Sequence, residues 1–519
     1  MGGMAEHVEV GSGPVSRAQV LAVARDGATV GLTGAAVEAL TAARRFIDEL
    51  AMDAEPHYGV STGFGALATT FIPADRRVAL QRSLIRSHAA GAGPLVEAEV
   101  VRAMMLLRLR TLASGRTGVR PATAHALVAL LNAGLVPAVP EHGSLGCSGD
   151  LAPLAAVALT LMGEGEVTDA GGRRWPTSRA LAEHGIAPVT LAEKEGLALI
   201  NGTDGMLGML VLAGHDLAVL LDTADLAAAM STEALLGTDR AFAADLQALR
   251  PHPGQAVSAA RMFALLAGSP IVDSHRGPGC TRVQDAYSLR CAPQVHGAAR
   301  DTLTHAMAVA DRELASMVDN PVVLADGRVE SNGNFHGAPL GYVADFCAIA
   351  VADVASMAER RTDRMLDTAR SHGLPPFLAE APGVDSGHMI AHYTQAGVVA
   401  ELKRLAVPAS VDSIPTSAMQ EDHVSMGWAA ARKLRRALDG LVTVLAVELV
   451  TAARALELRA PLRPAPATAA AVRALRAAGV PGPGPDRHLA PELAAAERAV
   501  RAGNLLAAVT PFLSGPTSR

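Results

Sequence analysis

Apolar residues recur along most of the chain at the three- and four-residue spacing of helices that bury one face. After Thr33, a residue type that caps helix N-termini, this spacing predicts a helix to about Leu50. A second helix is predicted from Arg77 to His88. Nothing in the pattern predicts a large sheet.

Longer stretches are nearly free of helix-breaking residues. These are residues 206–236, 296–318, 338–366 and 422–458. The last contains no proline and would measure about 55 Å at 1.5 Å per residue. Antiparallel stacking of such helices gives a bundle. We therefore expect an all-α fold with a long central antiparallel helix bundle and a smaller N-terminal domain.

Composition suggests three parts of the chain. We expect a mostly helical N-terminal domain over residues 1–195, the long-helix bundle over 196–460 and a C-terminal segment over 461–519. The last segment is rich in Pro and Ala and contains the linker-like run Pro481-Gly482-Pro483-Gly484-Pro485. Long Ala-rich helices usually bury against more than one neighbour, so we also expect an oligomer.

Charge and composition exclude several classes of partner. The formal net charge of −6, without a basic stripe, argues against nucleic acid. Pro, Gly or charged residues interrupt the apolar runs before the ~20 residues of a membrane span. The first residues include Glu6 and Glu9 and no apolar core, so no signal peptide is evident. The four cysteines form no CxxC pair, which suits a reducing cytoplasm.

The most informative stretch is the Gly-rich loop around Cys147-Ser148-Gly149. Such loops usually only turn the chain. Here, however, the lack of a side chain on Gly149 would allow its nitrogen to approach the carbonyl carbon of Cys147. Ring closure and loss of water, including the Ser148 hydroxyl, would give an imidazolone with an exocyclic methylidene. That group is an electrophile, which ordinary side chains do not supply.

The surrounding sequence, GSLGCSGDLAPL over residues 143–154, resembles the cofactor-forming segment of the aromatic amino acid ammonia-lyases. This family includes histidine, phenylalanine and tyrosine lyases and related aminomutases. The resemblance extends from about Val15 to the C-terminal region and includes further motifs in the expected order: YGVSTGFG from Tyr58, NGT from Asn201, QDAYSLRCAPQ from Gln284 and GNFHG around Phe335. It implies a 4-methylidene-imidazol-5-one (MIO) cofactor formed from Cys147, Ser148 and Gly149, without metal or nucleotide.

The resemblance also implies roles for individual residues. Tyr58 would be the general base, with Asn201 beside the cofactor. His88, in the pair Ser87-His88, and Glu421 resemble the histidine lyases, because a carboxylate suits an imidazole that donates N–H.

A second group of residues would act on the rest of the substrate. Tyr287 would be catalytic, and Arg290 would bind the α-carboxylate with its bidentate fork. Gln284 would position cofactor and substrate, and Phe335 would lie against the cofactor.

Together these features imply a carbon–nitrogen lyase of histidine degradation, which removes ammonia from L-histidine and leaves trans-urocanate. Family members are homotetramers with shared active sites, so the loops containing Tyr58, Ser148 and Tyr287 are expected to meet only after assembly. This expectation is an analogy at the level of the fold.

Other interpretations stay open. A lyase for another aryl amino acid, or a 2,3-aminomutase, shares these motifs, and Ser83, His296 and His392 depart from the family pattern in a way that leaves room for another substrate. An inactive helical scaffold is a more remote alternative. The pair His388 and His392 has metal-ligand spacing, but it lacks the Glu of an HExxH motif and is interpreted as a packing pair.

Overall fold

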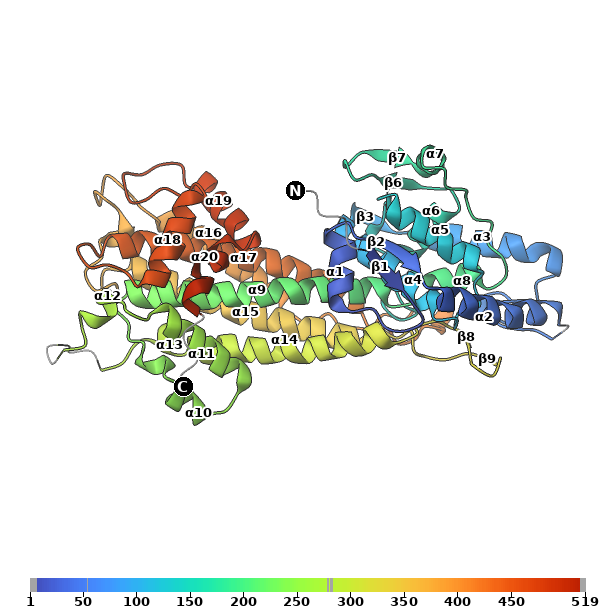
Figure 1. Cartoon of the computed structure of the whole chain (residues 1–519), viewed down its shortest axis with the longest axis horizontal. Coiled ribbons are helices and arrows are strands. Elements are labelled where there is room, and N and C mark those ends of the chain that lie inside the picture. The colour runs from blue at the N-terminus through green and yellow to red at the C-terminus, as the bar shows by residue number, and fades with distance from the viewer. Residues whose placement is uncertain (1–6, 54, 278–279, 281–282, 514–519) are drawn as a thin grey trace. The chain divides into compact units, whose positions relative to one another are not determined.

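The computed structural model describes residues 7–53, 55–277, 280 and 283–513. The chain forms two compact units (Figure 1), each assembled from three separate segments. The first unit consists of Met1–Leu212, Ala306–Asp345 and Pro408–Arg432, and the second of Ala213–His305, Phe346–Val407 and Lys433–Arg519. The division predicted from composition, at residues 195 and 460, stays a prediction.

Helices dominate the first unit. They are α1 (Arg17–Arg25), α2 (Gly34–Met52), α3 (Arg77–His88), α4 (Ala98–Ala113), α5 (Pro121–Asn132), α6 (Leu151–Leu161), α7 (Thr177–Glu183) and α8 (Glu195–Ile200). The predicted cap is present, since Thr33 Oγ1 accepts a hydrogen bond from the backbone N–H of Ala36 at 3.1 Å. The predicted helix from Arg77 to His88 has the same bounds in the structure.

Every strand in the described part of the chain is short and lies in the first unit. β1 (His7–Val10) and β2 (Thr29–Leu32) pair in parallel, whereas the remaining pairs are antiparallel. These pairs are β3 (Ala92–Leu95) with β5 (Pro140–His142), β6 (Glu166–Thr168) with both β4 (Val136–Pro137) and β7 (Arg174–Pro176), and β8 (Val322–Val323) with β9 (Val329–Glu330). With strands this short, the all-α fold class is confirmed.

The second unit contains mostly short helices. They are α10 (Ala244–Ala248), α11 (Pro253–Leu265), α12 (Pro270–Asp273), α13 (Tyr287–Arg290), α16 (Met389–Leu405), α18 (Pro466–Ala477), α19 (Ala490–Arg501) and α20 (Asn504–Leu513). Within this unit α20 packs against α18, α19 and α11. The Pro- and Ala-rich C-terminal segment is therefore part of a packed core.

Four long helices begin in one unit and end in the other. They are α9 (Asp204–Ala234), α14 (Ala292–Ala315), α15 (Ala338–Leu366) and α17 (Gly427–Glu457). The prediction for residues 338–366 is confirmed in full. The prediction that the last helix begins at residue 422 is wrong: Met426 has a left-handed φ of 51°, and its N–H donates to the carbonyl of Leu145 at 2.8 Å, so α17 begins only at Gly427.

Two helical stretches are apolar and long enough to cross a membrane when judged by length and composition alone. They are Glu195–Ala234 and Ala338–Leu366. From the sequence, we expected Pro, Gly or charged residues to interrupt every apolar run before it reached the length of a membrane span. In their most apolar windows, 78% and 61% of the residues are buried inside the protein. This burial is typical of helices in the core of a large protein.

Candidate active site

The loop that contains Cys147-Ser148-Gly149 is anchored by Asp150. The N–H of Asp150 donates to the carbonyl of Gly202 at 2.7 Å. Its carboxylate accepts hydrogen bonds from the N–H groups of Gly205 and Met206, at 2.8 and 3.0 Å, in the first turn of α9. Complete burial raises the pKa of Asp150 to about 7. The loop is thus fastened to the start of a long helix.

Glycine is required where the loop meets its neighbours. Gly149 has a left-handed φ of 77°, and a Cβ there would overlap the carbonyl group of Gly202. On the other side of the loop, the carbonyl of Gly146 accepts hydrogen bonds from Gly337 N–H at 2.8 Å and Ser425 Oγ at 2.6 Å. All three segments of the first unit therefore contribute contacts to the loop.

The side chains of the tripeptide meet Glu421. Ser148 Oγ donates to Glu421 Oε1 at 2.9 Å, and Cys147 Sγ donates to Oε2 at 3.2 Å. Burial, together with the Glu421 carboxylate, raises the pKa of the Cys147 thiol to about 12, so this thiol is protonated and able to donate.

Asn201, just after α8, contacts the backbone of the tripeptide. Its Nδ2 donates to the carbonyl of Ser148 at 3.1 Å. Its Oδ1 is buried and has no hydrogen-bond partner among the described residues. Because a buried acceptor without a partner costs free energy, this atom indicates a group that the chain itself does not provide.

Buried ion pairs support the turn that follows Asn201. Arg108 donates through Nε to Asp204 Oδ2 at 2.9 Å and through Nη1 to the carbonyl of Ala198 at 3.0 Å. A Cβ on Gly202 would overlap the Arg108 guanidinium. Nearby, Lys194 Nζ donates to Asp319 Oδ2 at 2.6 Å, with both side chains almost completely buried. The backbone around Asn201 is therefore closely packed.

A cavity of about 550 Å³ opens in front of these groups. Its walls come from all three segments of the first unit. The predicted site residues that line it are Tyr58, His88, Cys147, Ser148, Asn201, Phe335 and Glu421. Gly149, the third residue of the tripeptide, lies behind them against Gly202.

Tyr58 and His88 approach the cavity from the N-terminal part of the unit. Tyr58 Oη accepts the N–H of Gly65 at 3.2 Å, and its ring lies edge-on to Phe64 with centroids 6.3 Å apart. His88 ends α3, and its Nδ1 lies 2.9 Å from the carbonyl of Leu84. Burial lowers the pKa of His88. The neutral ring therefore donates from Nδ1 to Leu84 and retains the Nε2 lone pair as an acceptor.

The remaining predicted residues lie in the second unit and are not among the described residues that line this cavity. Gln284 is exposed, and Tyr287 and Arg290 form the single turn α13. As expected for residues three apart in a helix, they share a face, with the Arg290 guanidinium 4.8 Å from the centroid of the Tyr287 ring. Arg290 Nε is buried without a hydrogen-bond partner in the described chain.

Sequence reasoning missed several residues of the site. Thr416 Oγ1 donates to Glu421 Oε2 at 3.1 Å. His336 and His423 also line the cavity, with parallel rings whose centroids are 5.7 Å apart. His336 and His423 belong to the motifs of Phe335 and Glu421, and that proximity was the available signal. Thr416 lies only five residues before Glu421, but the left-handed turn through Ser417, Ala418 and Met419 that brings the two side chains together has no glycine to signal it.

His296 and His392, which depart from the family pattern, each contact a carboxylate within the second unit. His296 Nδ1 lies 2.8 Å from Asp225 Oδ1, and both side chains are fully buried. His392 Nε2 lies 2.6 Å from Glu359 Oε1, whereas His388 Nδ1 lies 3.1 Å from Thr451 Oγ1. The described residues include no group of three or more His, Cys, Asp or Glu side chains placed to hold a metal ion.

Comparison with known proteins agrees with this geometry. The sequence model of the aromatic amino acid lyase family matches residues 15–477 of the chain. Histidine ammonia-lyases of Streptomyces coelicolor and Streptomyces griseus are each 65% identical to the chain, over 98% of its length and 99% of theirs. The chain belongs to the aromatic amino acid lyase family.

Solved structures show the same fold. A tyrosine aminomutase from Streptomyces globisporus has a TM-score of 0.91 at 38% identity and covers 98% of this chain and 100% of its own. A histidine ammonia-lyase from Trypanosoma cruzi has a TM-score of 0.89 at 37% identity, with 98% and 95% covered. Family and fold therefore include both lyases and aminomutases, and the choice between them depends on the site.

Proposed function

We propose that this protein is a histidine ammonia-lyase. It would break the Cα–N bond of L-histidine and remove a proton from Cβ, which gives trans-urocanate and ammonia without oxidation. The observation that best supports this proposal is the placement of Glu421 and His88 in one cavity with Cys147 and Ser148. The name of the relatives that are 65% identical agrees with it.

The tripeptide suits the MIO cofactor. Its formation requires the Gly149 nitrogen to bond to the Cys147 carbonyl carbon, whose oxygen leaves as water, and Ser148 to lose its hydroxyl and Cα proton as a second water. A loop fixed by hydrogen bonds at Gly146 and Asp150, with glycine at position 149 where a Cβ would not fit, favours such a ring closure. When formed, the cofactor supplies an electrophilic carbon that makes the substrate amine a better leaving group.

The imidazole ring would bind between His88 and Glu421. The lone pair on His88 Nε2 accepts one ring N–H, because Nδ1 is engaged by Leu84. The Glu421 carboxylate would accept the second N–H of a protonated imidazole ring in the same cavity. A phenyl ring has no N–H for either acceptor and would leave the carboxylate desolvated without compensation, so this pair favours histidine over phenylalanine and tyrosine.

Tyr58 would remove the β-proton. Its hydroxyl oxygen lies in the cavity and, within the described part of the chain, accepts one hydrogen bond, from Gly65 N–H at 3.2 Å, so a further lone pair remains to take the proton. Asn201 would orient the substrate amine. Its Nδ2 donates to the carbonyl of Ser148, and its Oδ1, which has no partner in the described chain, could accept a hydrogen bond from the amine.

The carboxylate end of the substrate would be bound by Arg290, with Tyr287 and Gln284 beside it. These residues lie outside the cavity of the first unit, and Arg290 Nε has no partner in the described chain. By analogy with the family, we infer a homotetramer in which neighbouring subunits complete each site. A protein of this kind would act in the cytoplasm, on a small molecule and with no nucleic acid or membrane partner.

The direct test is to mix purified protein with L-histidine and to follow urocanate by its near-ultraviolet absorbance while ammonia is assayed in parallel. We expect both to rise in equal amounts. If neither rises, the intact mass decides what failed. A deficit of two waters would mean that the cofactor is present and the substrate is wrong, with L-tyrosine and its β-amino isomer tested next. A full mass would mean an inactive scaffold.

A further inference from the structure

The carboxylate of Glu421 is held by more donors than recognition of a substrate ring requires. Oε1 accepts from Ser148 Oγ at 2.9 Å, whereas Oε2 accepts both from Cys147 Sγ at 3.2 Å and from Thr416 Oγ1 at 3.1 Å. In the unmodified loop, therefore, Oε2 already accepts two hydrogen bonds, whereas Oε1 accepts one and shares its surroundings with the Ser148 hydroxyl.

The three donors differ in what becomes of them. Ser148 loses its hydroxyl when the MIO cofactor forms, so its hydrogen bond to Oε1 is lost at maturation. Cys147 keeps its thiol and Thr416 its hydroxyl, because neither group takes part in ring closure. Loss of one donor would free Oε1 and leave Oε2 with both of its own.

The backbone explains why Thr416 reaches Glu421. Their N–H and C=O groups pair across a short bridge, with Thr416 N–H to Glu421 O at 3.0 Å and Glu421 N–H to Thr416 O at 3.3 Å. The chain between them turns through Ser417, Ala418 and Met419, all with left-handed φ values between 52° and 69°. This tight turn places both side chains at the same edge of the cavity.

We propose that Cys147 and Thr416 are positioning residues that fix Glu421 Oε2 and so direct Oε1 to the ring N–H of the substrate. The inference rests on the proposed histidine lyase function. It assigns a role to the thiol of the tripeptide, which ring closure itself does not use. A hydrogen bond to a charged group typically changes affinity about tenfold or more, so each donor is expected to affect histidine binding measurably.

The test uses full-length Ser148→Ala protein, which cannot form the cofactor and therefore binds ligand without turnover. Calorimetry would measure its affinity for L-histidine and for L-phenylalanine, with Cys147→Ala or Thr416→Val added. We expect each addition to weaken histidine binding about tenfold and to leave phenylalanine binding within about twofold. The conservative changes Cys147→Ser and Thr416→Ser retain a donor and should restore most of the histidine affinity.

Outcomes separate this inference from the function on which it rests. If Ser148→Ala protein binds histidine and both additions leave that affinity unchanged, the positioning roles are wrong while the function stands. Equal losses for histidine and phenylalanine would indicate general packing and would also overturn the inference. If Ser148→Ala protein binds no histidine, the proposed function and the inference both fail. If Thr416→Val did not fold, Cys147→Ala alone would decide.

Discussion

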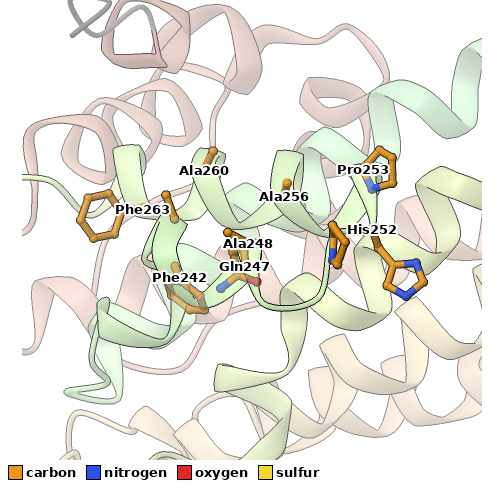
Figure 2. A pocket seen from close by; sticks show the side chains of 10 residues that line it. Phe242, Gln247, Ala248, His252, Pro253, Ala256, Ala260 and Phe263 are labelled. Carbon is orange, nitrogen blue, oxygen red and sulfur yellow. The ribbon is translucent and has the colours of Figure 1, made fainter.

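Two cavities of the same size, about 550 Å³ each, differ completely in their chemistry. The cavity of the first unit gathers two imidazoles besides His88, two carboxylates, amides, hydroxyls and a thiol. The cavity of the second unit lies beside α10 and α11 (Figure 2), and its walls are mostly Ala, Pro and Phe side chains. Volume alone would rank them equally as binding sites.

The polar atoms of the two cavities show which one is prepared for a ligand. In the second unit, Gln247 Nε2 donates to the carbonyl of Ala241 at 2.9 Å and its Oε1 accepts from Gln255 at 2.8 Å, so its amide is already engaged. In the first unit, Asn201 Oδ1 and His336 Nε2 are buried without partners in the described chain. Convergent polar groups left unsatisfied, rather than space, mark the reactive cavity.

The largest expected effect comes from Ser148→Ala in the first cavity. Without the hydroxyl no methylidene forms, and no other side chain supplies an electrophile, so we expect histidine turnover to fall at least about 10³-fold. Size-exclusion chromatography should show unchanged assembly. Normal turnover by this variant would disprove the MIO proposal.

Glu421→Gln tests whether the first cavity recognises the ring by charge. The amide keeps the shape of the side chain but removes the negative charge, so we expect kcat/KM for L-histidine to fall about 10- to 100-fold. The melting temperature should change by only a few degrees. Equal kcat/KM values for Glu421→Gln and the parent protein would contradict the proposal that the charge of Glu421 selects histidine as substrate.

Two histidines sharpen the comparison, because burial lowers the pKa of both His88 and His388. His88 lines the first cavity, whereas His388 is buried in the second unit, where burial and Arg454 lower its pKa to about 3. Between pH 3 and 6.5, His388 is therefore protonated in the unfolded chain but neutral in the folded chain. The free energy of unfolding falls as the pH falls through this range.

His388→Gln should remove that part of the acid sensitivity. From pH 6.5 to pH 4 we expect the variant to lose about 3 kcal/mol less stability than the parent protein, as measured by urea unfolding. Its kcat/KM at pH 8 should stay within about twofold. An identical pH dependence of stability in both proteins would show that His388 is not held neutral.

The smallest effect is expected in the second cavity. Ala260 lies on the exposed side of α11 and lines this cavity (Figure 2). Ala260→Leu partly fills it with a residue that helices tolerate well, so we expect kcat/KM to change by less than about twofold. A tenfold loss would mean that the apolar cavity takes part in the reaction, and the contrast between the two cavities would fail.

Local patterns in the sequence predicted much of this molecule. The helical pattern gave the helix from Arg77 to His88, and the scarcity of helix-breaking residues gave the long helix from Ala338 to Leu366, both with their observed bounds. Helix propensity and capping depend on neighbouring residues, so they are readable without a fold. The motifs likewise pointed to Tyr58, His88, Asn201 and Glu421, which line one cavity.

Local patterns did not predict contacts between residues that are far apart in the sequence. Residue 422 was predicted as a helix start because nothing local shows that Met426 bonds to Leu145, more than 270 positions earlier in the chain. The contact of Cys147 Sγ with Glu421 Oε2, between residues 274 positions apart, has the same character.

The sequence by itself determined the helices, the residue types of the site and a tripeptide with the composition that cyclisation needs. Only the tertiary structure decided which segments contact the loop of that tripeptide, that the side-chain oxygen of Asn201 has no partner in the described chain, and which oxygen of Glu421 accepts from Cys147. The reason is physical: hydrogen bonds of side chains depend on distance and direction, and those are set by packing between segments far apart in the chain.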